Sequence, residues 1–185
     1  MNQEPGRRGK LVVIRGPMFA GKTTELMRRA RMASASGRIV RIIKPRRDTR
    51  YAHGEIVTHS GVHMGATPVE SAGGIVCTVD GVGHVLIDEA HFFGDSLALV
   101  VDELLARGVD VTVAGVDLDH RGALFEPFGA LGLMVGEVVG LTAVCSVCGG
   151  AAMYTQRMTG GAERIVVGGA EMYEPRCAKC FVPCA

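Results

Sequence analysis

Residues 16–23 have the composition of a polyphosphate-binding loop. They read GPMFAGKT and match the GxxxxGK(S/T) pattern in full. Glycine allows such a loop to curl so that its backbone N–H groups, and the start of the following helix, face the phosphates of a nucleotide. We expect Lys22 to reach the β- and γ-phosphates and the Thr23 hydroxyl to bind Mg²⁺. The other predicted nucleotide contacts come from the rest of the loop: Gly16, Pro17, Met18, Phe19, Ala20 and Gly21.

An acidic pair could supply the second half of a phosphoryl-transfer site. Asp88 and Glu89 directly follow a short apolar run at residues 84–87. In phosphate-loop proteins a carboxylate at the end of a neighbouring strand holds the Mg²⁺ shell. We predict that Asp88 binds this metal, directly or through water, and that Glu89 accepts a proton from the attacking oxygen. The alternative is a solvated strand end, where acidic residues are common.

Four of the six cysteines have the spacing of a structural zinc site. Cys145 and Cys148 form one CxxC pair and Cys177 and Cys180 form another, with 28 residues between the pairs. Each pair can turn two thiolates toward one point, and two pairs complete the tetrahedral four-sulfur set that Zn²⁺ prefers. We therefore predict one structural Zn²⁺, for which Cys184 could compete as a ligand. Redox or disulfide pairing is the alternative.

The elements that must position these residues alternate between strand and helix. Strands are predicted at residues 10–15, 38–44, 84–88 and 110–116, and helices at residues 22–36 and 96–107. Asp95 is the expected N-cap of the second helix. Glycine-rich residues 70–83 indicate either a poor helix or a loop. Alternating strands and helices predict an α/β fold, in which a parallel sheet of the P-loop NTPase (RecA-like) type is flanked by helices.

The pattern changes near residue 141. From about Cys145 onward the chain consists of short segments, paired glycines and cysteines. We predict a P-loop α/β domain over residues 1–141 and a small zinc-binding subdomain over residues 142–185.

Composition limits the partners that the chain could have. Its 185 residues, 48% of them hydrophobic, can bury one good core, and a net charge of +1 offers no broad basic surface. We expect no nucleic-acid or membrane partner. The first ten residues lack the apolar segment of a signal peptide, and no run of 18 apolar residues occurs, so a soluble cytoplasmic protein is expected.

Residues 88–91 spell DEAH, the letters of a helicase motif. A nucleic-acid motor needs two ATPase-like lobes, hence several hundred residues, and a basic track for the strand. This chain is too short and has too little net positive charge for either. A zinc-ribbon ATPase that uses the nucleotide only as a switch remains the alternative function.

Taken in order, the motifs resemble those of the type II thymidine kinase family, from about Lys10 to Cys180. The phosphate loop is followed by a KPxxDxRY segment, a hydroxyl-His-x-Gly element and a DE-x-x-FF segment. An AG-x-D-x-D-x-RG stretch, a PFG triplet and the cysteine quartet come next. The residues that carry the later motifs are Lys44, Pro45, Asp48, Arg50, Tyr51, Thr58, His59, Gly61, Phe92, Phe93, 114–122, 127–129, Tyr154, Arg157 and 166–173.

The resemblance implies transfer of the γ-phosphoryl of ATP to the 5′-hydroxyl of thymidine or deoxyuridine. It also implies a homotetramer that is inhibited by the end product dTTP. By this resemblance Glu89 is the catalytic base, and Lys22 and Arg50 are further catalytic residues. Asp48 is expected to help bind the metal and the phosphates. The zinc site would anchor a substrate lid over residues 155–173. The implied nucleoside pocket consists of Met18, Phe92, His120, Phe128, Thr155, Val166, Val167, Gly168 and Tyr173.

Three features depart from the family pattern. His120 stands where a Phe is usual, His91 replaces a Gln, and residues 123–125 form an insertion before the PFG triplet. A histidine at position 120 can still stack on a base, but it can ionise near neutral pH.

Overall fold

The computed structural model describes residues 7–50, 54–134, 136–161 and 163–183 of the chain. Tyr51 and Cys184, which entered the sequence predictions, lie outside the described residues. No helix among the described residues is long and apolar enough to cross a membrane.

A six-stranded parallel sheet forms the centre of the fold, in the order β5-β2-β6-β7-β1-β8. Every residue of β7 is buried, because helices cover both faces of the sheet. The prediction of a helix-flanked parallel sheet is confirmed. The strands are β1 (Leu11–Arg15), β2 (Val40–Pro45), β5 (Thr67–Val69), β6 (His84–Ile87), β7 (Asp110–Gly115) and β8 (Glu137–Gly140).

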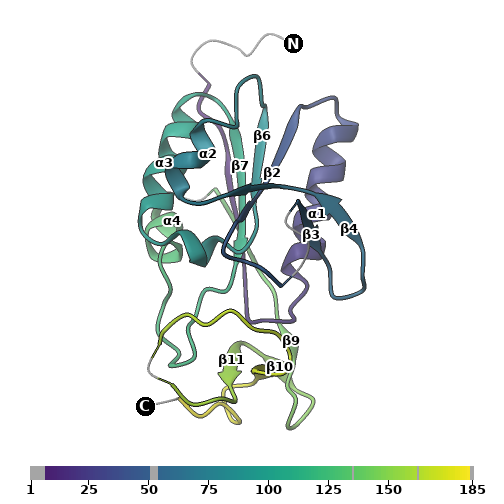
Figure 1. Ribbon diagram of the computed structural model, residues 1–185, viewed down its shortest axis with the longest axis vertical. Coiled ribbons are helices and arrows are strands. Elements are labelled where there is room, and N and C mark those ends of the chain that lie inside the picture. Colours follow the sequence, from purple (N-terminus) through teal and green to yellow (C-terminus); the bar gives the residue numbers. More distant parts are fainter. Residues whose placement is uncertain (1–6, 51–53, 135, 162, 184–185) are drawn as a thin grey trace.

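Side chains that alternate along the strands enter two different cores. On β6, Val85 and Ile87 pack in the larger core, whereas Leu86 packs in the smaller one. Helices α2 (Ala72–Val76), α3 (Ser96–Ala106) and α4 (Phe128–Met134) cover the first face, and α1 (Lys22–Ala35) covers the second (Figure 1). The glycine-rich residues 70–83 therefore contain a short helix. The buried residues of α3 share one face of the helix: Leu97, Val100, Val101, Leu104 and Leu105.

The prediction that the Asp95 side chain caps α3 is wrong. Asp95 precedes the helix, but its backbone is already helical (φ −59°, ψ −34°) and its side chain makes no capping hydrogen bond. A side chain on a helical backbone points away from the free N–H groups of the first turn, so Asp95 cannot serve them. A 3₁₀ helix at Ala90–Phe93 leads into this turn, and the Ser96 hydroxyl donates to the carbonyl of Phe93 at 3.1 Å.

The C-terminal part adds two small antiparallel pairs. One pair is β9 (Ala143–Val144) with β10 (Ala151–Ala152), and the other is β11 (Tyr154–Arg157) with β12 (Tyr173–Arg176). They lie beyond the end of the sheet at which β1 runs into the phosphate loop (Figure 1). A third hairpin, β3 (Glu55–Val57) with β4 (His63–Gly65), lies over the α1 side.

Candidate active site

The phosphate loop joins β1 to α1 and depends on two glycines. Gly16 has φ of 148°, and a Cβ there would lie 2.2 Å from the carbonyl oxygen of Leu141. Gly21 has φ of 81° immediately before the helix. Only glycine adopts both conformations without strain. The first turn of α1 is thereby turned toward the site.

Lys22, the first residue of α1, is buried beneath the loop. Its Nζ donates a hydrogen bond to the carbonyl of Pro17 at 2.5 Å. Burial lowers the pKa of Lys22, although the carboxylates of Glu89 and Asp88 act in the opposite direction. A desolvated ammonium that faces carboxylates across a pocket is suited to an anionic ligand such as a polyphosphate.

The acidic pair follows β6, beside the start of α1. The Thr23 hydroxyl donates to Asp88 Oδ2 at 3.0 Å, which brings together the two predicted Mg²⁺ ligands. A hydroxyl and a carboxylate are oxygen donors of the kind that Mg²⁺ prefers, so these residues fit the ion. Burial, together with the charge of Glu89, raises the pKa of Asp88 to about 7.

Glu89 is held in a left-handed backbone conformation, with φ 49° and ψ 44°. This conformation is unfavourable for a residue with a side chain and is typical of functional sites. The backbone N–H of Glu89 donates to Asp88 Oδ1 at 3.0 Å. The turn therefore directs two adjacent carboxylates into one pocket.

Arg50 links Glu89 to Asp48. Its Nη2 donates to Glu89 Oε1 at 2.5 Å, and its Nε and Nη2 donate to the two oxygens of Asp48 at 2.7 and 3.0 Å. Burial alone would lower the pKa of Arg50, but the two carboxylates raise it above its usual value. Burial likewise acts to raise the pKa of Glu89, but Arg50 and neighbouring cations outweigh it and lower this pKa to about 2. Glu89 is therefore ionised and available as an acceptor.

Two cavities meet at Arg50 and Glu89. The larger, of about 590 Å³, is lined by the phosphate loop, residues 48–50, Asp88 and residues 167–171. The smaller, of about 50 Å³, is lined mainly by apolar and aromatic side chains. Arg50 and Glu89 belong to both linings, together with Met18, Val116 and Gly168.

Most of the predicted nucleoside residues lie around the smaller cavity. Met18, Phe92, His120, Thr155, Val166, Gly168 and Tyr173 line it, whereas Val167 lines the larger cavity. Of the predicted nucleotide residues, Met18, Phe19, Gly21, Lys22, Thr23, Asp48 and Asp88 line the larger cavity, and Gly16, Pro17 and Ala20 do not.

Phe128 does not reach either cavity. It is buried in the core on α4, and its Cζ would lie 2.9 Å from a Cβ placed on Gly115 of β7. Phe125, which the sequence analysis placed in the insertion at residues 123–125, lines the smaller cavity instead. The feature of the sequence that could have identified Phe125 as a cavity residue is its aromatic side chain in a loop that follows β7.

The two unusual histidines are both buried beside the smaller cavity. His91 Nδ1 lies 3.6 Å from Glu89 Oε2, and its ring contacts those of Phe92 and Phe125. Burial lowers the pKa of His91 to about 4, and burial also lowers the pKa of His120. Both rings are therefore neutral at physiological pH. His91 Nδ1 and His120 Nε2 have no hydrogen-bond partner within the described part of the chain.

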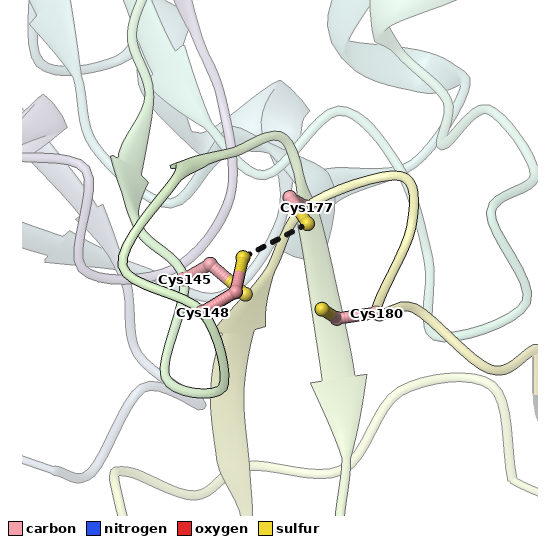
Figure 2. Close-up of side chains that lie close together, drawn as sticks. All are labelled: Cys145, Cys148, Cys177 and Cys180. Carbon is pink, nitrogen blue, oxygen red and sulfur yellow. Dashed lines mark hydrogen bonds between the residues drawn. The ribbon is translucent and has the colours of Figure 1, made fainter.

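The four paired cysteines gather at one point between two loops (Figure 2). Their Sγ atoms all lie within 4.8 Å of one another, and those of Cys148 and Cys177 are 3.5 Å apart. Tetrahedral Zn²⁺ with Zn–S bonds of about 2.3 Å requires sulfur separations of about 3.8 Å. The four thiols therefore fit a structural Zn²⁺ ion.

A lid, defined as residues 158–172, connects β11 to β12 and passes over both cavities; residue 162 in it is not described. The Tyr173 hydroxyl donates to the carbonyl of Val166 at 2.9 Å. On β11, the Thr155 hydroxyl accepts a hydrogen bond from the backbone N–H of Met18 at 3.0 Å. The C-terminal part thus contacts the phosphate loop directly.

Comparison of the sequence with known proteins gives one consistent result. A family model described as thymidine kinase matches residues 9–181. The thymidine kinase of Rhodothermus sp. is 42% identical over 178 residues, which cover 96% of this chain and 84% of that protein. That of Chloroflexus aurantiacus is 40% identical over 188 residues and 97% of each chain. That of Bacteroides fragilis is 38% identical and covers 97% of this chain and 90% of that protein.

Proposed function

The chain belongs to the thymidine kinase family, and from that membership we propose that its two cavities hold the two substrates of one phosphoryl transfer. The activity is that of an ATP-dependent thymidine kinase, which transfers the γ-phosphoryl group of ATP to the 5′-hydroxyl of thymidine. In this proposal the larger cavity binds ATP, and the smaller cavity binds thymidine or deoxyuridine.

The meeting of the two cavities at Glu89 and Arg50 carries this assignment. Phosphoryl transfer requires the acceptor oxygen to lie in line with the γ-phosphoryl group, beside a residue that orients it. An ionised carboxylate at the boundary between a phosphate pocket and an aromatic pocket occupies the place where such an acceptor oxygen would arrive.

Each residue of the site has a proposed role. Lys22 binds the β- and γ-phosphates, and Arg50 holds Glu89 Oε1 while facing the transferred group. Glu89 orients the 5′-hydroxyl and takes its proton as the new O–P bond forms and the bond to the β-phosphate oxygen breaks. The products are ADP and the nucleoside 5′-monophosphate. Thr23 and Asp88 would hold Mg²⁺, with Asp48 as the further proposed contributor, and the ion would neutralise charge on the phosphates.

The zinc site has a supporting role in the proposal. Cys145 and Cys148 precede the lid, and Cys177 and Cys180 follow it, so one ion would fix both ends of the segment that covers the cavities. Four thiolates saturate tetrahedral Zn²⁺ and leave no position for a substrate. We also propose the division into a kinase domain of residues 1–141 and a zinc-binding subdomain of residues 142–185.

The zinc-ribbon ATPase switch accounts for less of the site. A switch needs a nucleotide pocket and a mobile element, but it has no use for a second cavity that meets the first at a buried carboxylate. We further propose a cytoplasmic homotetramer inhibited by dTTP, on the strength of the family resemblance alone.

The deciding assay offers ATP and Mg²⁺ with each of the four deoxynucleosides and deoxyuridine, and separately with RNA. We expect product with thymidine and deoxyuridine only. RNA-stimulated ATP hydrolysis without a phosphorylated nucleoside would contradict the proposal and favour a nucleic-acid-dependent ATPase. ATP hydrolysis that no nucleoside changes would favour the switch.

A further inference from the structure

We propose that Arg164 clamps the lid onto the loop that follows β7 and thereby sets the affinity of the enzyme for its nucleoside. This inference rests on the proposed function, because it takes the smaller cavity to be the nucleoside pocket.

Arg164 makes three contacts with one neighbouring loop through its guanidinium group. Its Nε donates to Asp119 Oδ2 at 2.7 Å, and its Nη2 donates to the carbonyl of Leu124 at 2.8 Å. The plane of the group lies over the ring of Phe125, with Cζ 4.9 Å from the ring centroid. Lysine has neither the fork of donors nor the flat face that these three contacts use together.

The partner of the clamp is itself rigid. Asp119 is buried, and its Oδ1 accepts the backbone N–H groups of Arg121 and Ala123 at 3.0 and 2.9 Å. Its own N–H donates to the carbonyl of Ala123 at 2.8 Å. These bonds fix the carboxylate before the lid arrives, so little conformational entropy is lost from the Asp119 side when the ion pair forms.

The clamp lies at the wall of the smaller cavity. Arg164, Asp119 and Phe125 all line that cavity, together with the neighbouring lid residues Ile165 and Val166. Its volume of about 50 Å³ is far below the range of about 300 to 1,000 Å³ that is usual for small-molecule pockets. A nucleoside can therefore enter only if the lid moves, and Arg164 must release and re-form its contacts in each cycle.

Charge-assisted hydrogen bonds to a buried carboxylate are strong, but the Arg164 side chain is half exposed, at 49%, which weakens their net contribution. We expect Arg164→Met to raise the KM for thymidine by about 3- to 30-fold and to speed thymidine dissociation by a similar factor. The KM for ATP should change less, because Arg164, Asp119 and Phe125 line the smaller cavity but not the larger one.

Arg121→Met is the matched control. Arg121 lies on the same loop and is exposed, and within the described residues its side chain makes no hydrogen bond or ion pair. This variant removes a positive charge by the same substitution but breaks none of the three contacts of Arg164. It should therefore leave both KM values unchanged. Arg164→Lys, which retains the charge but not the fork, should fall between the parent and Arg164→Met.

The outcomes separate the clamp from the function on which it rests. If the parent phosphorylates thymidine and Arg164→Met behaves like Arg121→Met, the clamp is wrong and the kinase assignment stands. A parent that phosphorylates no nucleoside contradicts the proposed function itself. Thermal denaturation and zinc content identify a variant that has merely lost its fold, in which case Arg164→Lys carries the test. If Arg164→Met raised the KM for thymidine and the KM for ATP equally, that result would also contradict the clamp.

Discussion

Glu89 is the residue on which the catalytic interpretation depends. Its low pKa, about 2, makes it a weak base, which at first suggests poor catalysis. In a loose phosphoryl-transfer transition state, however, the acceptor hydroxyl loses its proton late, so orientation of that hydroxyl matters more than basicity. Arg50 fixes the Oε1 atom of this carboxylate, whereas Oε2, 3.6 Å from His91 Nδ1, makes no hydrogen bond within the described residues and can take up this task.

Glu89→Gln should therefore lower kcat by about 10²- to 10⁴-fold, because the neutral amide keeps the shape but accepts the hydrogen bond of the hydroxyl more weakly and cannot take its proton. Affinities for ATP and thymidine should change only a few-fold, as measured by equilibrium binding. Glu70→Gln makes the same change at an exposed carboxylate that pairs with Arg46, and it should leave kcat unchanged. Parental turnover in Glu89→Gln would assign the base to another group.

His120 should make nucleoside binding sensitive to acid. A neutral imidazole stacks on thymine more readily than a charged one can be desolvated beside it. Since burial lowers the pKa of His120 below the usual value of about 6.5, the KM for thymidine should be flat above that pH and rise only at more acidic pH. His91, with a pKa of about 4, titrates still lower.

The measurement is the thymidine KM at saturating ATP, so that acid effects on ATP binding do not enter it. His120→Phe should flatten the profile, whereas His63→Phe, at an exposed residue of β4, should leave it unchanged. An acid-independent KM in the parent would place the ring of His120 away from the bound base.

Single residues were predictable where a local motif fixes the geometry. Lys22, Thr23 and Asp88 follow from the phosphate loop and from the end of a strand, and the structure brings them together. Phe128 was misplaced because the loop before it determines which aromatic residue faces the cavity. That loop directs Phe125 inward and leaves Phe128 to pack against Gly115.

At the scale of elements, burial decides what the sequence reveals. Strands β6 and β7 are covered on both faces, so their continuous apolar runs identified them. The edge strands β5 and β8 were missed, since β5 contains Pro68 and most of β8 is exposed. Helix α4 was missed too, because two glycines interrupt its short apolar pattern.

The zinc site joins elements that have little core of their own. Each hairpin of the C-terminal part has strands of only two to four residues, too short to be stable alone. We expect one Zn²⁺ per chain, and strong chelation should lower the melting temperature and raise the KM for thymidine. Metal analysis of reduced protein, followed by thermal denaturation with and without chelator, checks both effects.

Cysteine variants make this prediction specific. Cys180→Ser should lose the metal, whereas Cys77→Ser, at an exposed thiol outside the cluster, should retain it. Cys184→Ser should also retain it if Cys184 takes no part. Zinc-free protein with an unchanged melting temperature would exclude a structural ion.

Across the whole molecule, the sequence predicted the parts better than their relative placement. Alternating strands and helices indicated the sheet, and the cysteine pairs indicated the zinc-binding part. Nothing local indicated that β11 would lie against the phosphate loop, because this contact joins residues 137 positions apart in the sequence. At the same end of the sheet, Arg15 of β1 and Asp117, which follows β7, form an ion pair in which Nη1 and Oδ2 are 3.2 Å apart.

Thr155 should couple the two substrates, because its partner Met18 lines both cavities. Thr155→Val keeps the shape but removes the acceptor, which leaves the N–H of the half-buried Met18 without this partner. We expect the affinities for a non-hydrolysable ATP analogue and for thymidine to fall together, each by up to about tenfold. Isothermal titration of each ligand measures this.

Thr155→Ser retains the hydroxyl and should bind both ligands like the parent. The joint loss also distinguishes this contact from the Arg164 clamp, whose removal should weaken thymidine binding alone. If Thr155→Val weakened only one ligand, or if Thr155→Ser were equally damaging, the hydrogen bond between β11 and the phosphate loop would not be what couples the two cavities.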